Sequence, residues 1–374
     1  MPNGTGKVAY NSDIKRKAWM SEGLIQKSAT SFWAPYKGTS FDSVIMVVND
    51  ISKGKGHTVV FDFDGNLSGK PVKGNKTAKG TGEQKKKFSD KLTVSDYRYV
   101  VDNGTKFDGV DIGDLSINEH SDSRSKLADL WVRSEDQAYF DLAQQSPEFG
   151  ITLATFTLDD LLDIEAKVKT GTGYDTTPSG ITKRLPLKPF KLANGKQIWL
   201  FLLDTYMKNM FLKSSGAQSL LAQADLRGND NRLITSQIGT IGNFLFLDAG
   251  SFFGTTDGSI LVDGYYEYEN TGVEIPGLRV LDTVTNKWSG EAGFDSSNQL
   301  QSRGVILGAG AFQKANGLMP DYKYEATDFG KFSESCLETW CAAKATKLLA
   351  ENSDYADGKV SGYVYGAIAV DIEL

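Results

Sequence analysis

The residue types that most often carry catalysis are scarce in this sequence. Its only histidines are His57 and His120, and its only cysteines are Cys336 and Cys341. A histidine-based zinc site or a cysteine–histidine pair would have to be built from these four residues. The cysteines have the spacing C-x4-C, and two thiols in a reducing compartment are more often inert than bonded. We therefore expect no metal site and no catalytic thiol.

Sequence patterns that bind nucleotides or activate a serine are also missing. The glycine-rich segments Gly54-Lys-Gly56 and Gly171-Thr-Gly173 lack the third glycine of a dinucleotide-binding turn, and neither lies between a strand and a helix. No phosphate-binding loop and no G-x-S-x-G elbow occurs. The sequence therefore predicts a protein with no cofactor and no catalytic residues, which is not an enzyme.

Two polar clusters could be given a chemical role. Glu119-His120 could act as a base and its orienting partner, but we interpret the pair as a polar approach to a helix. Asp159, Asp160, Asp163 and Glu165 could bind a cation, but acidic residues are favoured at helix N-termini without any ligand. Both clusters are therefore assigned a structural role.

A third charged segment, which we call the lysine loop (residues 65–87), separates two strand-like runs. It is rich in glycine, and Glu83 is its only acidic residue. Like charges and the lack of apolar residues prevent it from folding on itself. We weighed contact with an acidic neighbour, a merely solvated loop, and nucleic-acid binding, and we favour the first because arginine and aromatic partners are missing. Its lysines, Lys70, Lys73, Lys76, Lys79, Lys85, Lys86 and Lys87, are the candidate interface residues.

The overall composition indicates a folded protein that does not bind nucleic acid tightly. The net charge is −6, whereas proteins that neutralise phosphates are basic. Abundant glycine and aromatic residues indicate strands joined by tight turns. No signal peptide or membrane-length apolar run is visible, so we expect a protein kept in the cytoplasm, without membrane contact.

The periodicity of apolar residues predicts an α+β order of elements. The run from His57 to Phe63 alternates as a strand, and a second strand is expected over Leu92–Val101. A long helix is expected over Ser121–Gln145, with Glu135 and Asp141 on its polar face.

Shorter elements are expected on both sides of a buried strand over Lys196–Leu203. A capping box at Thr157–Asp160 predicts one helix before this strand, and Asp204 begins another directly after it. Residues 336–349 fit a helix slightly better than two short strands, and Tyr363–Ile372 forms the closing strand.

The order of these segments resembles the major capsid proteins of tailed double-stranded DNA phages, in particular the N4-like family. The resemblance spans nearly the whole chain, and it is carried by the order and spacing of its motifs. The lysine loop departs from the family, where a more acidic segment is expected. The matching segments are Gly56–Phe61, Leu67–Gly69, Leu130-Trp131, Phe156–Leu162, Trp199–Met207, Arg303–Ala311 with Ala315, Asp328–Gly330 and Tyr365–Asp371.

The resemblance implies an HK97-like fold and an icosahedral shell of pentamers and hexamers around double-stranded DNA. Scaffolding, portal and decoration proteins are the expected partners, and the location is the virion, after assembly in the host cytoplasm. Trp19 and Trp33 of the arm are further candidate interface residues. The implied division is an N-terminal arm at 1–55, an E-loop at 56–101, a P-domain at 102–195 with its spine helix at 121–145, an A-domain at 196–350, and a closing strand at 351–374 that returns to the P-domain.

Two other classes of protein were weighed. An encapsulin-like compartment has the same fold but encloses cargo enzymes, and the N4-like motifs argue against it. A β-rich enzyme or a surface adhesin is disfavoured because residues suited to catalysis are scarce.

Overall fold

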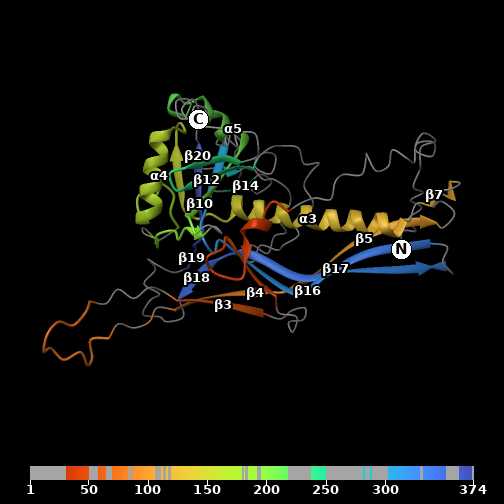
Figure 1. The fold of residues 1–374 in the computed structure, drawn as a ribbon, viewed down its shortest axis with the longest axis horizontal. Coiled ribbons are helices and arrows are strands. Elements are labelled where there is room, and N and C mark those ends of the chain that lie inside the picture. Colours follow the sequence, from red (N-terminus) through yellow and green to blue (C-terminus); the bar gives the residue numbers. More distant parts are fainter. Residues whose placement is uncertain are drawn as a thin grey trace.

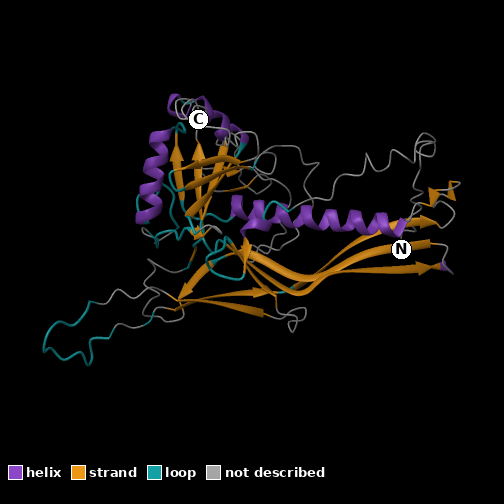
Figure 2. Ribbon diagram, in the orientation of Figure 1, coloured by secondary structure: helices purple, strands orange, loops and turns teal. Residues whose placement is uncertain are grey.

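The protein is described from a computed structural model, in which helices and strands build an elongated α+β molecule (Figures 1 and 2). The structure describes residues 31–49, 58–64, 70–82, 85, 87–105, 111–112, 115–116, 119–178, 181, 184–191, 195–217, 237–249, 281–282, 287–288, 302–328, 332–350 and 362–372. The tryptophan at position 19 lies outside the described residues. The elements are η2 Ala34–Tyr36, β1 Lys37–Gly38, β2 Ile45–Asn49, β3 Thr58–Asp64, β4 Lys87–Thr93, β5 Ser95–Thr105, β6 Asp111–Ile112, β7 Leu115–Ser116, α3 Glu119–Gln145, β8 Gly150–Leu153, α4 Leu158–Thr170, β9 Phe190–Lys191, β10 Gln197–Leu203, α5 Thr205–Lys213, β11 Gln237–Ile241, β12 Phe244–Asp248, β13 Leu281–Asp282, β14 Lys287–Trp288, β15 Ser302–Leu307, β16 Phe312–Thr327, β17 Phe332–Ala345, β18 Lys347–Ala350, β19 Tyr363–Val364 and β20 Ala367–Ile372.

The long helix α3 confirms the expected spine. Its 27 residues span roughly 40 Å. Leu127 and Trp131 are the buried apolar positions of its N-terminal half, whereas nearly every side chain described from Ser134 to Gln144 is buried. The prediction that Glu135 and Asp141 lie on a solvated face is wrong, because this half of the helix is enclosed on all sides.

A five-stranded sheet in the order β1-β2-β16-β17-β5 runs beside α3 (Figure 1). β16 and β17 form a long antiparallel ribbon that pairs from Phe312 with Ala345 to Thr327 with Phe332. The slight preference for a helix at 336–349 is therefore wrong. β17 lies between two strands, which supply the hydrogen bonds that a helix would have made internally.

The second large sheet has the order β11-β12-β10-β15-β20-β8, and β9 also pairs with β10. β10 confirms the buried strand. Its Leu200 and Leu202 pack in the same apolar cluster as α3, while Phe201 and Leu203 pack with α4 and α5 on the other face. Helices therefore cover both faces of the strand, which explains its nearly continuous apolar sequence.

The two shorter helices begin as expected. Thr157 and Asp160 form a reciprocal capping box at the start of α4, and Gly171 ends this helix in the left-handed conformation. Asp204 caps α5, because its side chain accepts a hydrogen bond from the Met207 amide at 2.7 Å.

The hairpin that carries the lysine loop is formed by β3 and β4, within a sheet of order β19-β18-β4-β3. The second strand expected at Leu92–Val101 is in fact two strands that separate at Val94. β4 pairs with β3, whereas β5 leaves the hairpin and pairs with β17. The hairpin is thus connected directly to the long sheet beside α3.

A close approach of two backbones makes Gly366 a sensitive position. A Cβ atom there would lie 2.1 Å from Ala311 Cα, far inside van der Waals contact. We predict that Gly366→Ala lowers the free energy of unfolding by about 1–3 kcal/mol or more, because the backbone segments directly before β20 and β16 must move apart. Thermal and denaturant unfolding of the purified protein measure this loss. Gly82→Ala is the matched control because a Cβ atom there meets nothing within 4 Å. Equal stability of the two variants would refute the packing argument.

Candidate subunit-contact surfaces

The lysine loop extends away from the rest of the chain (Figure 1). Every described residue of 70–82 is exposed, including Lys70, Lys73, Lys76 and Lys79. Lys85 and Lys87 are exposed as well, whereas the lysine at position 86 lies outside the described residues. The described part of the loop is therefore not buried against the rest of its own subunit.

The base of the hairpin is fixed firmly to the body. Asp90 on β4 is 1% exposed, and its carboxylate lies 2.6 Å from Lys344 Nζ. It also accepts hydrogen bonds from Gln313 Nε2 at 3.1 Å and from the Lys347 amide at 2.9 Å. Val59 and other apolar side chains of β3 and β4 pack against β2, β16 and β17. The loop is therefore a free tip on an anchored stem.

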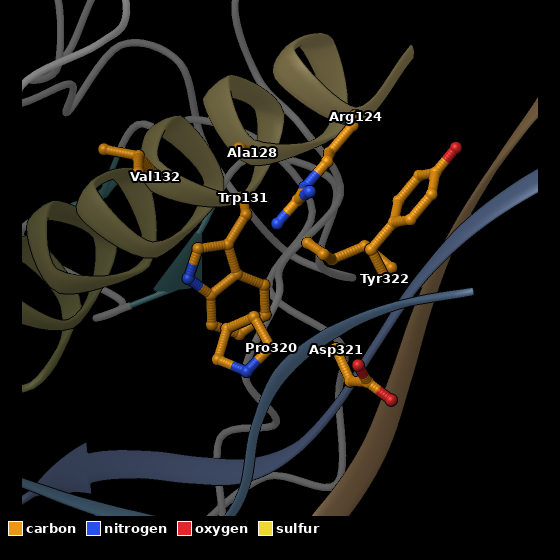
Figure 3. A pocket seen from close by; sticks show the side chains of 8 residues that line it. Arg124, Ala128, Trp131, Val132, Pro320, Asp321 and Tyr322 are labelled. Atoms are coloured by element: carbon orange, nitrogen blue, oxygen red, sulfur yellow. The ribbon is translucent and has the colours of Figure 1, made fainter. Parts of the chain in front are cut away.

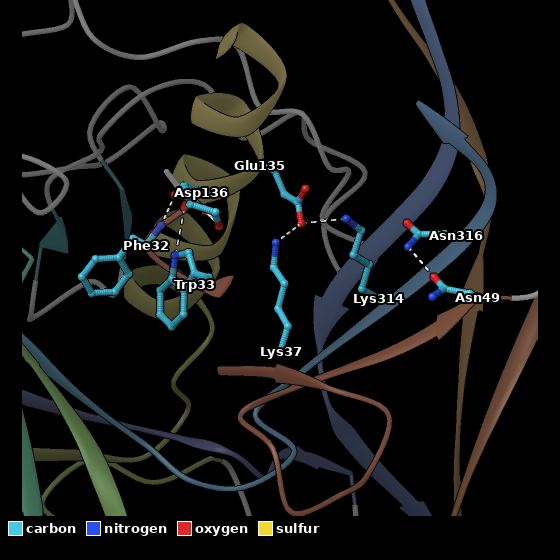
Figure 4. A network of polar contacts seen from close by, with 9 residues as sticks. Phe32, Trp33, Lys37, Asn49, Glu135, Asp136, Lys314 and Asn316 are labelled. Atoms are coloured by element: carbon cyan, nitrogen blue, oxygen red, sulfur yellow. Dashed lines mark hydrogen bonds and ion pairs between the residues drawn. The ribbon is translucent and has the colours of Figure 1, made fainter. Parts of the chain in front are cut away.

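Trp33 of the expected arm has a position different from the one predicted. Its side chain is 0% exposed and packs against Tyr139 and Phe140 of α3 and against Phe312 of β16. Trp33 Nε1 donates a hydrogen bond to the Asp136 carbonyl at 3.2 Å (Figure 4). Trp33 is thus a core residue of its own subunit, and the prediction that it contacts a neighbour is wrong. The apolar residues that surround its ring come from α3 and β16 as well as from the arm.

Buried charges attach this same segment to the spine helix. Glu135 accepts from Lys314 Nζ at 2.6 Å and forms a second ion pair with Lys37 of β1 (Figure 4). Burial alone would raise the pKa of Glu135, but the two ammonium groups outweigh it and lower the pKa. Asp136 accepts from Ser31 Oγ and the Phe32 amide, both at 2.6 Å. These contacts dock residues 31–38 on their own subunit.

Arg184 is another buried charge that sequence reasoning missed. Its guanidinium donates to the carbonyls of Ala367, at 3.2 Å, and of Tyr365. The rings of Phe149 and Tyr363 lie 5.2 and 5.9 Å from its Cζ atom. Burial lowers the pKa of Arg184. The sequence around Arg184 does not indicate that its side chain is buried, because its partners are backbone oxygens and aromatic rings from distant segments.

A cavity of about 410 Å³ lies between α3 and the β16–β17 ribbon (Figure 3). Its lining is mixed, with Trp131, Tyr322 and Leu337 beside Arg124 and Asp321. The Arg124 guanidinium lies 5.9 Å from the centre of the Tyr322 ring. No nucleophile paired with a base lines this cavity, so it offers no catalytic arrangement.

The clusters considered for chemistry fill structural roles where they are described. Asp160 caps its own helix, and Glu165 pairs with Lys169 at 2.5 Å and accepts from Asn243 at 2.7 Å. Cys336 and Cys341 are free thiols. Within the described ranges, no group of three or more metal-ligating side chains converges, and no helix is long and apolar enough to cross a membrane. The histidine at position 57 and the side chains at 119 and 120 lie outside the described set.

The architecture of this chain is similar to that of chains in known phage capsid structures. A family model described as phage capsid protein matches residues 7–141, whereas no curated protein matches the chain. The capsid structure of Helicobacter pylori bacteriophage KHP30 is similar, with a TM-score of 0.68, 15% identity, and 93% and 92% of the two chains covered. The chain has the fold of a phage capsid protein.

Two further capsid structures support the same fold. The capsid of Ralstonia phage GP4 has a TM-score of 0.64 at 15% identity, covering 92% of this chain and 91% of that one. The Cyanophage Pam1 capsid has a TM-score of 0.61 at 11% identity, covering 98% of both. Because this capsid fold covers nearly the whole of each chain, the expected α+β, capsid-type fold class is confirmed.

Asp141 provides a test of the buried charges in the spine. Its carboxylate is 2% exposed and accepts from Gln137 Nε2 at 2.8 Å. Burial raises its pKa from 3.8 to about 7. The folded state therefore holds a proton that the unfolded state releases above pH 4. This difference makes stability fall between pH 4 and pH 7, by up to about 4 kcal/mol, and level off above that range.

We predict that Asp141→Asn stabilises the protein at pH 8 and has little effect at pH 4, because the amide stays neutral. Unfolding free energies measured from pH 4 to pH 8 give both curves. Asp163→Asn on the exposed surface of α4 is the control, and it should follow the wild-type curve. If Asp141→Asn merely shifts the whole curve downward, the carboxyl group is charged in the folded protein.

Proposed function

We propose that this chain is the major capsid protein of a tailed double-stranded DNA phage, a structural subunit that self-assembles into an icosahedral shell. The observation that carries the proposal is the capsid fold, which extends over more than 90% of this chain and of the similar phage capsid chains. The lysine loop adds a second argument. The described residues of this cationic segment are exposed, so they are accessible to a neighbouring subunit.

The finer assignments follow the N4-like resemblance. We assign residues 1–55 to an arm, 56–101 to an E-loop, 102–195 to a P-domain around α3, 196–350 to an A-domain, and 351–374 to the return strand. Pentamers and hexamers of this subunit enclose double-stranded DNA without sequence-specific contacts. Scaffolding, portal and decoration proteins complete the particle, which assembles in the host cytoplasm. The overall negative charge suits a container that must release its DNA.

The first test is whether the purified protein assembles. We expect closed, uniform shells of megadalton mass, visible by electron microscopy and measurable by light scattering. Shells enclosing DNA in infected cells would support a capsid, whereas shells enclosing a cargo enzyme would indicate a compartment protein. A protein that remains monomeric at high concentration over a range of salt would overturn the proposal.

The second test concerns the lysine loop. We predict that Lys73→Glu with Lys76→Glu leaves the unfolding temperature unchanged, because both side chains are exposed on the free tip. Particle yield should fall because the loop can no longer attract an acidic neighbour. Lys196→Glu on the body is the control. Unchanged particle yield from the double variant would show that the loop is only a solvated segment.

A further inference from the structure

The stem of the β3–β4 hairpin meets the five-stranded sheet at a buried polar joint. Asp90 of β4 contacts Gln313 of β16 and Lys344 of β17 there. Thr346, which directly follows β17, completes the group. We call these four residues the stem joint. Asp90 is 1% exposed, and Gln313 and Thr346 are 0% exposed, so the joint is closed to bulk solvent.

The carboxylate of Asp90 is fully occupied by donors from its own subunit. Its Oδ1 atom lies 2.6 Å from Lys344 Nζ and accepts from the Lys91 amide at 2.9 Å. Its Oδ2 atom accepts from Gln313 Nε2 at 3.1 Å and from the Lys347 amide at 2.9 Å. A carboxylate has about four lone-pair positions. Asp90 therefore has no free position for a further donor.

Two other oxygens of the joint have no hydrogen-bond partner among the described residues. They are Gln313 Oε1 and Thr346 Oγ1, and both are buried. The backbone of Thr346 is already used, because its amide donates to the Ala311 carbonyl and its carbonyl accepts from the Tyr365 amide. Leaving a buried polar atom unpaired costs more free energy than a normal hydrogen bond contributes. Each of these oxygens therefore needs a partner.

The strand register places the two oxygens at the same point. Gln313 pairs with Lys344, and Thr346 lies two residues farther along the chain, on the same face of the strand as Lys344. Side chains at such diagonal positions reach one another. The contacts of Asp90 agree, since one of its oxygens accepts from both Gln313 and the amide of Lys347, the residue after Thr346.

We propose that the stem joint binds one internal water molecule, which donates to Gln313 Oε1 and accepts from the Thr346 hydroxyl. Buried waters in globular proteins commonly satisfy groups of this kind. A metal cation fits the joint poorly. It would meet only these two oxygens, whereas calcium and magnesium take about six or more. The ammonium group of Lys344 would also repel it.

The position of this water gives it a structural role. Gln313 belongs to the long five-stranded sheet, whereas Thr346 lies where β17 ends and β18 of the hairpin's own sheet begins. A water bonded to both residues links the two sheets at this corner. It therefore acts together with Asp90 in fixing the angle of the stem that carries the lysine loop.

The sign of a stability change in the full-length protein tests the proposal. Thr346→Val keeps the shape of the side chain and removes its hydroxyl group. We expect this variant to lose about tenfold in the folding equilibrium constant, because the water loses a partner and Gln313 Oε1 is left unpaired. Denaturant unfolding measures the loss. Thr155→Val at an exposed position is the matched control and should keep the wild-type constant.

A structure at a resolution that shows ordered solvent provides a second readout. We expect one density peak about 2.7–3.2 Å from both Gln313 Oε1 and Thr346 Oγ1. Thr346→Ser retains the hydroxyl group and should keep the peak, whereas Thr346→Val should lose it. Thallium(I), a heavy probe for monovalent cation sites, should give no anomalous peak in the joint.

Three results would overturn the inference. The first is a Thr346→Val protein as stable as the wild type or more stable, as expected when a methyl group replaces an unpaired hydroxyl. The second is the lack of a density peak within reach of both oxygens. The third is a thallium peak, which would assign the joint to a cation. All of these measurements apply to the single subunit, so they do not depend on whether the protein forms a shell.

Discussion

Burial of the C-terminal half of α3 is the constraint on which the rest of the structure depends. One cluster of apolar side chains joins Tyr139 and Leu142 of this helix to Leu200 and Val305 of the second sheet. The same cluster contains Trp33 of the leading segment. The helix therefore shares one core with both large sheets. Its N-terminal half contributes Leu127 and Trp131 to the same core and supports the long sheet on one face.

Charged groups inside this core orient its parts. Arg303 and Asp371 form a bidentate pair at 2.7 and 2.8 Å, and Arg303 also donates to the Gln144 carbonyl at the end of α3. Glu135 and Asp90 have similar roles for the leading segment and the hairpin stem. Buried ion pairs of this kind add little net stability, since desolvation offsets their attraction. Their directional bonds instead hold the stem and the helix at one relative angle, and this angle determines where the lysine loop points.

Much of the architecture could be predicted from local patterns. α3, the capping box of α4, the Asp204 cap and the buried strand β10 each follow from residues within one segment. The long β16–β17 ribbon could not be predicted in this way, because pairing across strands decides it and Cys336, Leu337 and Cys341 also fit helical spacing. Burial of Glu135 and Asp141 depended on Lys37, Lys314 and Gln137. A polar residue on a helix is read as solvated unless its distant partners are known.

The candidate site, too, could be predicted from the sequence only in part. The lysine loop was predictable because its composition alone excludes a packed structure. Trp33 was not, because a tryptophan in a segment with few apolar neighbours fits an intermolecular contact equally well until Phe312 and Phe140 are placed around it. The proximity of the exposed carboxylates of Glu325, Glu334 and Asp102 was invisible in the sequence as well. These residues come from three strands, and only the register of β16, β17 and β5 places them opposite one another.

The strength of such a loop contact suits assembly of a large shell. An exposed ion pair contributes about 0–1 kcal/mol, and salt weakens it further. A single loop on a single neighbouring subunit therefore binds weakly, and a misplaced subunit can leave. In a closed ring every subunit donates one loop and accepts another, so two contacts must break before a subunit leaves. Weak, directional and repeated contacts thus allow errors to be corrected during assembly while the completed shell remains stable. A strongly apolar loop would bind more tightly but would trap misplaced subunits, and it would also promote aggregation of the free subunit.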